Sequence, residues 1–160
     1  FKQKTAYEIM PSLVGSEMCI RDRNNAIKDI SPKFIAAGAL KVIPLNVSGA
    51  FHSPLMKNAK PKLDEHLSTM SISDSAFPIY SNFTSKPVTD KLEIYHALLN
   101  QIENPVLWHR SVSRMINDGT KAAIEIGPGK VLQGLSKRID RSLIMYGAES
   151  YEDILNLTNV

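Results

Sequence analysis

The stretch "KAAIEIGPGKVLQGLSKRI", residues 121–139, carries the clearest signal for the fold. Its opening apolar residues predict a short strand, and a tight Gly-Pro-Gly turn follows at 127–129. The apolar spacing beyond the turn predicts a helix that ends near residue 139. A strand, a turn and a helix in direct succession are typical of an α/β protein with a largely parallel sheet.

The same alternation continues on both sides of this stretch. A weak strand in "SLIMYG" and a short helix in "SYEDILNL" follow it, and helices over about 91–102 and 106–117 precede it. Asp90 can cap the first of these two helices, and Gly119 should end the second. Strands and helices that alternate in this way indicate an α/β layer architecture.

The first half of the chain predicts two further strands and two helices that contain proline. The strands are expected in "ALKVIPLNV", residues 39–47, and in "AFPIYSNF". A helix within residues 24–37 should be broken or delayed at Pro32, and a helix starting near Pro54 should kink at Pro61. Proline in a helix interior removes a backbone donor and clashes with the preceding turn.

Composition excludes several classes of protein. With 160 residues, 43% of them hydrophobic and 22% charged, the chain has the composition of a soluble globular domain or of a piece of one. A net charge of +3 is too weak to indicate nucleic-acid binding, and no apolar run approaches the roughly 20 residues that span a bilayer. Cys19 is the only cysteine, which excludes an internal disulfide and a site with several cysteine ligands.

His52 is the first candidate for chemistry, in "VSGAFHSPLM", residues 47–56. It follows a predicted strand at the end where open α/β sheets place their ligands, and an imidazole suits proton transfer near neutral pH. The alternative is a histidine hydrogen-bonded in the core or at a turn, and the local pattern leaves both open. His66, His96 and His109 fall on predicted helices and are interpreted as surface residues, and no zinc-ligand spacing is present.

The "GPGK" turn, residues 127–130, could offer backbone N–H groups to an anion, or could simply be a tight structural turn. It matches neither the P-loop pattern nor the dinucleotide fingerprint. The G-x-S-x-G elbow that exposes a nucleophilic serine is absent from the chain, and neither Ser53 nor Ser136 has its flanking residues. A base at His52 would therefore act on a nucleophile that this sequence does not contain.

Three stretches together resemble the C-terminal part of the malonyl-CoA:acyl carrier protein transacylase family. They are "IPLNVSGAFHSPLM" at 43–56, "NQIENPVLWHRSV" at 100–112 and "EIGPGKVLQGLSKRI" at 125–139. They lie in the family's order and at its spacing, and the resemblance runs from about residue 24 to the C-terminus. The rival interpretations are an acyltransferase domain of a polyketide or multidomain fatty acid synthase, and a non-catalytic binding module.

The resemblance implies a fold and a site. Residues 24–47 would be the last helix and strand of a small ferredoxin-like subdomain, and 48–160 the C-terminal half of a hydrolase-like parallel-sheet core. His52 would be the catalytic base, the main-chain carbonyl of Gln101 would orient it, and Phe51 would select a malonyl-sized acyl group. The family's serine, in a G-H-S-x-G elbow, and its carboxylate-binding arginine have no counterpart here, so the chain alone should be inactive.

The resemblance also implies reactants and a setting. Malonyl-CoA would be the donor and the phosphopantetheine arm of acyl carrier protein the acceptor, in cytoplasmic fatty acid biosynthesis. No permanently bound cofactor, nucleic acid or membrane is expected. Residues 1–23 lie outside the resemblance. They resemble a translated sequencing-adapter artefact, most specifically in "MPSLVGSEMCIRDR", and are expected to be a leader without order or function.

Overall fold

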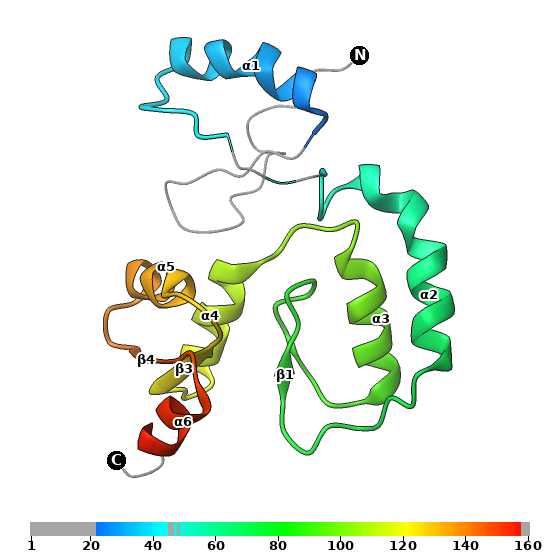
Figure 1. The fold of residues 1–160 in the computed structure, drawn as a ribbon, viewed down its shortest axis with the longest axis vertical. Helices are drawn as coiled ribbons and strands as arrows, with labels where there is room; N and C mark the ends of the chain where they lie inside the picture. Colours follow the sequence, from blue (N-terminus) through cyan, green and yellow to red (C-terminus); the bar gives the residue numbers. More distant parts are fainter. Residues whose placement is uncertain (1–21, 45–46, 48, 158–160) are drawn as a thin grey trace.

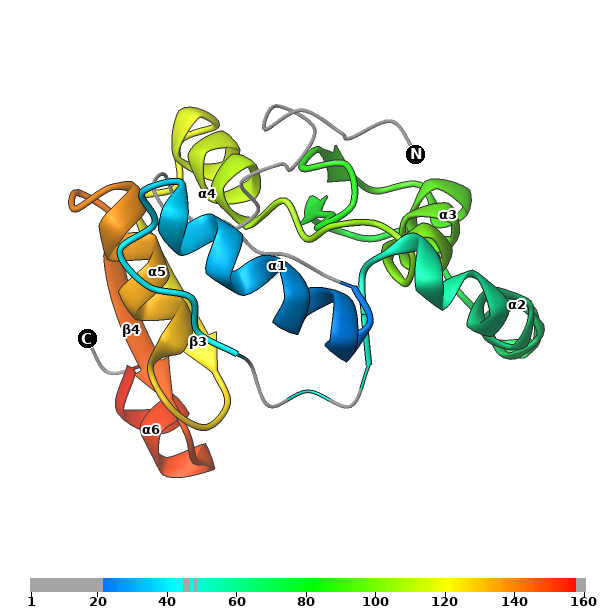
Figure 2. The ribbon, with the colours of Figure 1, turned by 90° about the horizontal axis from the view of Figure 1, so that it is seen from above.

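The computed structural model describes residues 22–44, 47 and 49–157. Figure 1 shows two lobes, one built on α2 and α3 and the other on α4, α5 and the β3–β4 pair, with α1 apart from both at one end. Figure 2, seen from above, shows the α4–α5–β3–β4 lobe and the α2–α3 lobe on opposite sides of the molecule. The elements are α1 (Asn24–Ala36), the 3₁₀ helix η2 (Pro54–Ala59), α2 (Lys60–Thr69), β1 (Ile79–Tyr80), β2 (Pro87–Val88), α3 (Lys91–Gln101), α4 (Trp108–Asn117), β3 (Ala122–Ile126), α5 (Val131–Ile139), β4 (Ile144–Ala148) and α6 (Tyr151–Leu157).

The stretch at 121–139 folds as its pattern predicts. Strands β3 and β4 pair in parallel, in register from Ala122 opposite Ile144 to Ile126 opposite Ala148, and α5 connects them. The helix lies close to the sheet at Gly147, where an added Cβ would come within 2.5 Å of the Gln133 side-chain nitrogen. A strand–helix–strand unit with parallel strands confirms the α/β class.

The lobe built on α2 and α3 also contains a short antiparallel ribbon. Strands β1 and β2 pair antiparallel, and α2 packs against α3. Asp90 caps α3 as predicted, because its carboxylate accepts from the backbone N–H groups of Leu92 and Glu93. Tyr95 in α3 also donates a hydrogen bond to Asp64 in α2. The Asp90 cap fixes the start of α3, and the Tyr95–Asp64 bond joins α3 to α2.

Three local predictions were wrong. Residues 39–44 form no strand, because no strand among the described residues lies alongside to accept their hydrogen bonds and Leu40 is fully exposed. Residues 45, 46 and 48 lie outside the described part. Helix α1 continues through Pro32 to Ala36. Pro61 does not kink a helix, because α2 starts at Lys60 and Pro61 falls in its first turn, where a missing N–H costs nothing.

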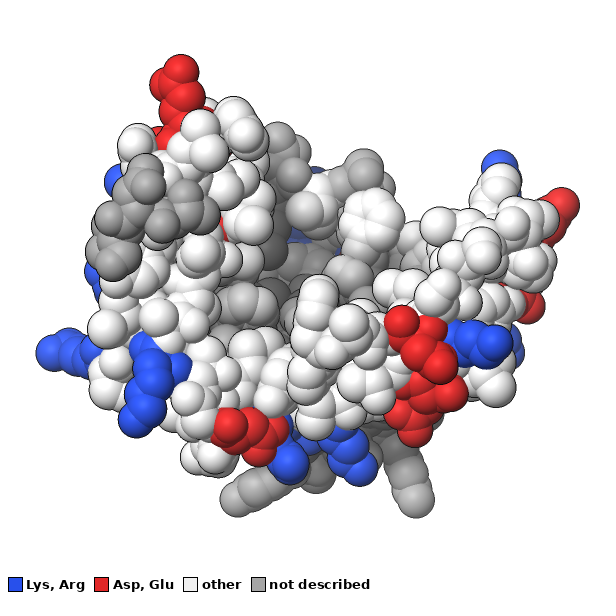
Figure 3. All heavy atoms as spheres, turned by 90° about the horizontal axis from the view of Figure 1, so that it is seen from below, with Lys and Arg blue, Asp and Glu red and all other residues white. Residues whose placement is uncertain are grey.

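Other boundaries differ by less. The strand predicted in "AFPIYSNF" is limited to Ile79–Tyr80, and α4 begins at Trp108 rather than near 106. Helices α3 and α6 and strand β4 lie where they are expected. In Figure 3, charged side chains of both signs are scattered over the face shown, as a net charge of +3 suggests.

Candidate active site

His52 lies in the turn before η2 and faces the C-terminal end of α3. Its backbone has φ of 60°, in the left-handed region that non-glycine residues rarely adopt. The His52 N–H donates to the Ile102 carbonyl at 3.1 Å, which ties this strained turn to α3. Such conformations persist only where the surrounding structure holds them, and they concentrate at functional sites.

The imidazole makes a second bond to the same helix end. Nδ1 lies 2.8 Å from the Gln101 carbonyl oxygen, and the half-buried ring bridges 49 residues of sequence in doing so. A backbone carbonyl can only accept, so Nδ1 carries the hydrogen and Nε2 keeps its lone pair in the neutral ring. His52 is therefore held with Nε2 available to accept a proton.

The geometry of α3 explains why these carbonyls are available. The last four carbonyls of a helix have no partner within it, and here the Gln101 and Ile102 carbonyls point out of the final turn. The turn is held by side chains: Gln101 donates to the Asn104 carbonyl at 2.9 Å, and Asn104 donates to the Asn100 carbonyl at 2.7 Å. Helix α3 has already ended at Gln101, and Pro105 disfavours a helical backbone at residue 104.

Phe51 and Ser53 flank the histidine with different roles. The Phe51 ring is 44% exposed and lies over Gly49, with Cε2 3.7 Å from where a Cβ of that glycine would be. Ser53 is buried; its hydroxyl donates to the Ala50 carbonyl at 2.6 Å and accepts from Leu55 N–H at 3.3 Å. Ser53 thus caps η2, a role that the Ser-Pro pair ahead of an apolar stripe could have predicted.

The turn at 127–130 supports the structural alternative. Gly127 and Gly129 have φ of 135° and 88°, values that favour glycine, and the Glu125 carboxylate accepts from the N–H groups of Leu132 and Gln133 at 2.9 and 3.1 Å. The hydrogen bond from Leu132 lowers the pKa of Glu125 below its ordinary value. A carboxylate of the chain itself already occupies the N-terminus of α5, where an anion would bind.

The remaining titratable candidates lie away from this junction. His66, His96 and His109 are exposed on α2, α3 and α4, as the sequence indicated. Within residues 22–44, 47 and 49–157, His, Cys, Asp and Glu form no group that could hold a metal ion. Over the same residues, no helix is long and apolar enough to cross a membrane.

The chain is similar to curated proteins, although no protein-family model matches it. Malonyl CoA-acyl carrier protein transacylase of Bacillus subtilis (strain 168) is 45% identical over 106 residues, which are 66% of this chain and 33% of that protein. The enzyme of the same name from Staphylococcus aureus (strain COL) is 36% identical over 128 residues, 80% of this chain and 42% of that protein. The chain is similar to a part of these transacylases that makes up 33% and 42% of their lengths.

Solved transacylase structures share the fold as well. A malonyl-transacylase in complex with a type II PKS acyl-carrier protein superposes with a TM-score of 0.78 at 35% identity, covering 86% of this chain and 45% of that one. An acyl-carrier-protein S-malonyltransferase from Burkholderia pseudomallei 1710b gives 0.78 at 32% identity, with 86% and 45% covered. The chain thus spans less than half the length of the transacylases that it matches.

Proposed function

We propose that this chain supplies the base half of a malonyl transfer site, with His52 as the base and the Gln101 carbonyl as its orienting partner. The observation that carries the proposal is the 2.8 Å hydrogen bond from Nδ1 to that carbonyl. The bond fixes the tautomer in which Nε2 can accept a proton, as the carboxylate does in a Ser-His-Asp triad, but without adding a negative charge. The homology to transacylases supplies the reaction class.

The reaction follows from general base chemistry. A serine hydroxyl is a weak nucleophile near neutral pH and needs an adjacent base. His52 Nε2 takes the serine proton while the serine oxygen attacks the malonyl thioester; the coenzyme A thiolate leaves and takes that proton. The thiol of the phosphopantetheine arm then gives its proton to His52 and attacks the acyl-serine, and the proton returns to the serine. The serine comes from the part of the transacylase that this chain lacks.

Two features of the chain extend the proposal. The exposed Phe51 ring beside His52 forms the pocket wall that limits the acyl group to malonyl size. In fold terms, β3, α5 and β4 form part of a hydrolase-like core, while α1 is the last helix of a small ferredoxin-like subdomain. Domain boundaries near residues 24 and 48 are part of the same proposal.

The proposed partners are malonyl-CoA and an acyl carrier protein, and the proposed pathway is fatty acid biosynthesis in the cytoplasm. The relatives named malonyl CoA-acyl carrier protein transacylase support the two partners. No permanently bound cofactor is required, because proton transfer and the acyl-serine account for the reaction.

Substitution in the full-length protein tests the base assignment. With malonyl-CoA and carrier protein as substrates, His52→Ala should reduce kcat by about 10²-fold or more, because general base catalysis contributes that much. His66→Ala, which removes an exposed imidazole from α2, is the matched control and should transfer normally. Near-normal transfer by His52→Ala would refute the assignment.

The gene tests whether this chain is part of a longer transferase. An in-frame G-H-S-x-G upstream of Asn24 supports the proposal, because that motif supplies the missing nucleophile. An intact upstream frame without the motif favours the non-catalytic binding module instead.

A further inference from the structure

Lys60, the first residue of α2, reaches across to the last turn of α3. Its ammonium donates to the Asn100 side-chain oxygen at 2.8 Å and pairs with the Glu103 carboxylate. The Lys60 and Glu103 side chains are only 27% and 21% exposed. Such a pair is less screened by solvent than a fully exposed one, and the ammonium has two acceptors at once.

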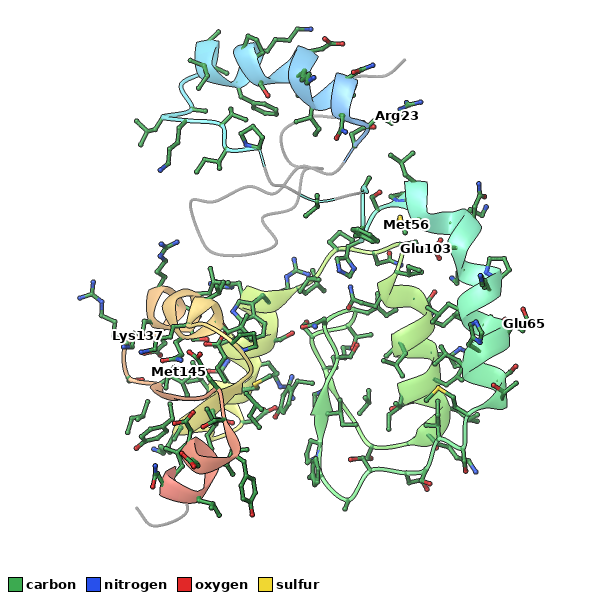
Figure 4. All side chains as sticks on the ribbon, viewed as in Figure 1. Arg23, Met56, Glu65, Glu103, Lys137 and Met145 are labelled. Atoms are coloured by element: carbon green, nitrogen blue, oxygen red, sulfur yellow. The ribbon has the colours of Figure 1, made fainter. Side chains whose placement is uncertain are left out.

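The two acceptors lie on either side of the carbonyls that hold His52. Asn100 precedes and Glu103 follows Gln101 and Ile102, which accept the two hydrogen bonds from the histidine. Figure 4 labels Glu103 at this junction, where α3 ends near the start of α2. Lys60 therefore contacts the turn on both sides of the Gln101 and Ile102 carbonyls.

The segment from His52 to Lys60 is pinned to this turn at both of its ends. It runs without interruption through η2 into α2, whose first residue is Lys60. We propose that Lys60, through Asn100 and Glu103, is a positioning residue that keeps the Gln101 carbonyl in line with His52 Nδ1. The functional meaning of this role rests on the proposed function, in which His52 is the base.

Holding α2 against α3 is the simpler role that such a cation could have. Other contacts already do this: Tyr95 bonds to Asp64 between the same helices, and Leu67 and Ala97 are buried. Lys60 is distinguished from those contacts by its place at the His52 end of the pair. Its removal should consequently change the tautomer of His52 more than it changes helix packing.

Nitrogen-15 NMR of the histidine rings in the full chain tests the proposal, at a pH where imidazole is neutral. Lys60→Met should lower the ratio of Nδ1–H to Nε2–H tautomer of His52 by about threefold or more, because loss of one carbonyl hydrogen bond has an effect of that order. Lys60→Arg should restore most of the ratio, since it keeps a cation at the same place. Lys62→Met, which removes an exposed cation from the same helix, should leave the ratio unchanged.

An unchanged His52 ratio in a folded Lys60→Met chain overturns the proposal, and so does an equal change in Lys62→Met. Should Lys60→Met fail to give a folded spectrum, Glu103→Gln decides, because it keeps the shape and removes the charge. Glu103→Gln should lower the His52 tautomer ratio by a smaller amount than Lys60→Met does. An unchanged ratio in Glu103→Gln would overturn the proposal.

The readout needs neither the serine nor substrate. Normal transfer by His52→Ala would defeat the base assignment and leave the tautomer result standing. An unaltered tautomer ratio would defeat the role of Lys60 and leave the base assignment standing.

Discussion

His52 shows how a single residue acquires its role from a distant segment. The local sequence places a histidine between Phe51 and Ser53, and only the family resemblance indicates the Gln101 carbonyl as its partner. In the fold, its backbone N–H and its ring both bond to the end of α3, about 50 residues away. The two residues beside it have different roles: Ser53 caps η2, whereas the Phe51 ring stays exposed.

Phe51 gives a prediction at this scale. In the full-length protein, Phe51→Ala should shift the ratio of kcat/KM for methylmalonyl-CoA over malonyl-CoA upward by about tenfold, the low end of what one methyl group in a pocket contributes. Competition between the two thioesters measures the ratio. Phe77→Ala removes a ring that is 70% exposed and serves as control. An unaltered ratio in Phe51→Ala would show that the ring is no pocket wall.

At the scale of elements, the β3–turn–α5 unit is fixed by its own sequence. Two glycines with positive φ make the turn, and Glu125 of β3 satisfies the first free N–H groups of α5. Residues 39–44 show the opposite case. Their pattern suits a strand, but a strand needs a neighbour for its hydrogen bonds, and none of the described segments provides one.

Glu125 makes the stability of this unit depend on pH. Hydrogen bonds from the α5 backbone lower its pKa in the folded state, so its stabilising effect is present above its unfolded pKa. The effect disappears as pH falls through the lower, folded value. Urea midpoints should therefore be higher for wild type than for Glu125→Gln at pH 7, and the gap should narrow below about pH 4.

Glu149→Gln is the control for this measurement, since Glu149 is exposed. It should have the same urea midpoint as wild type at pH 7 and at pH 3, because it removes a carboxylate that lies on the surface. A gap that stays constant from pH 7 to pH 3 would contradict the role of the Glu125 carboxylate.

The whole molecule exposes an apolar sheet face. Ile124 and Ile126 of β3 and Ile144 and Tyr146 of β4 are 50%, 74%, 53% and 37% exposed and share one face, while α5 covers the other. The buried core of the described residues is small by comparison, with Val112, Leu143 and Ala148 among its members. Contiguous apolar surface of this kind is uncommon on soluble monomers.

We expect the 160-residue chain to bind a hydrophobic dye and to self-associate through this face. Replacing Ile126 and Ile144 by Thr should reduce dye fluorescence roughly twofold and favour the monomer in light scattering, because Thr removes apolar surface but keeps strand propensity. Leu92→Thr with Leu98→Thr removes exposed leucines from α3 as the control. If the two double substitutions reduced dye fluorescence and self-association equally, total exposed apolar area, and not this sheet face, would determine both properties.

By itself, the sequence determined the α/β class, the strand–turn–helix unit, the capped start of α3 and the residues that match the transacylase motifs. Each of these depends on contacts within about 20 residues, so composition and spacing carry the information. Only the tertiary structure decided that Lys60 meets the turn that holds His52, and that Tyr95 of α3 bonds to Asp64 of α2. These follow from hydrogen bonds and ion pairs whose partners are brought together only when the elements pack.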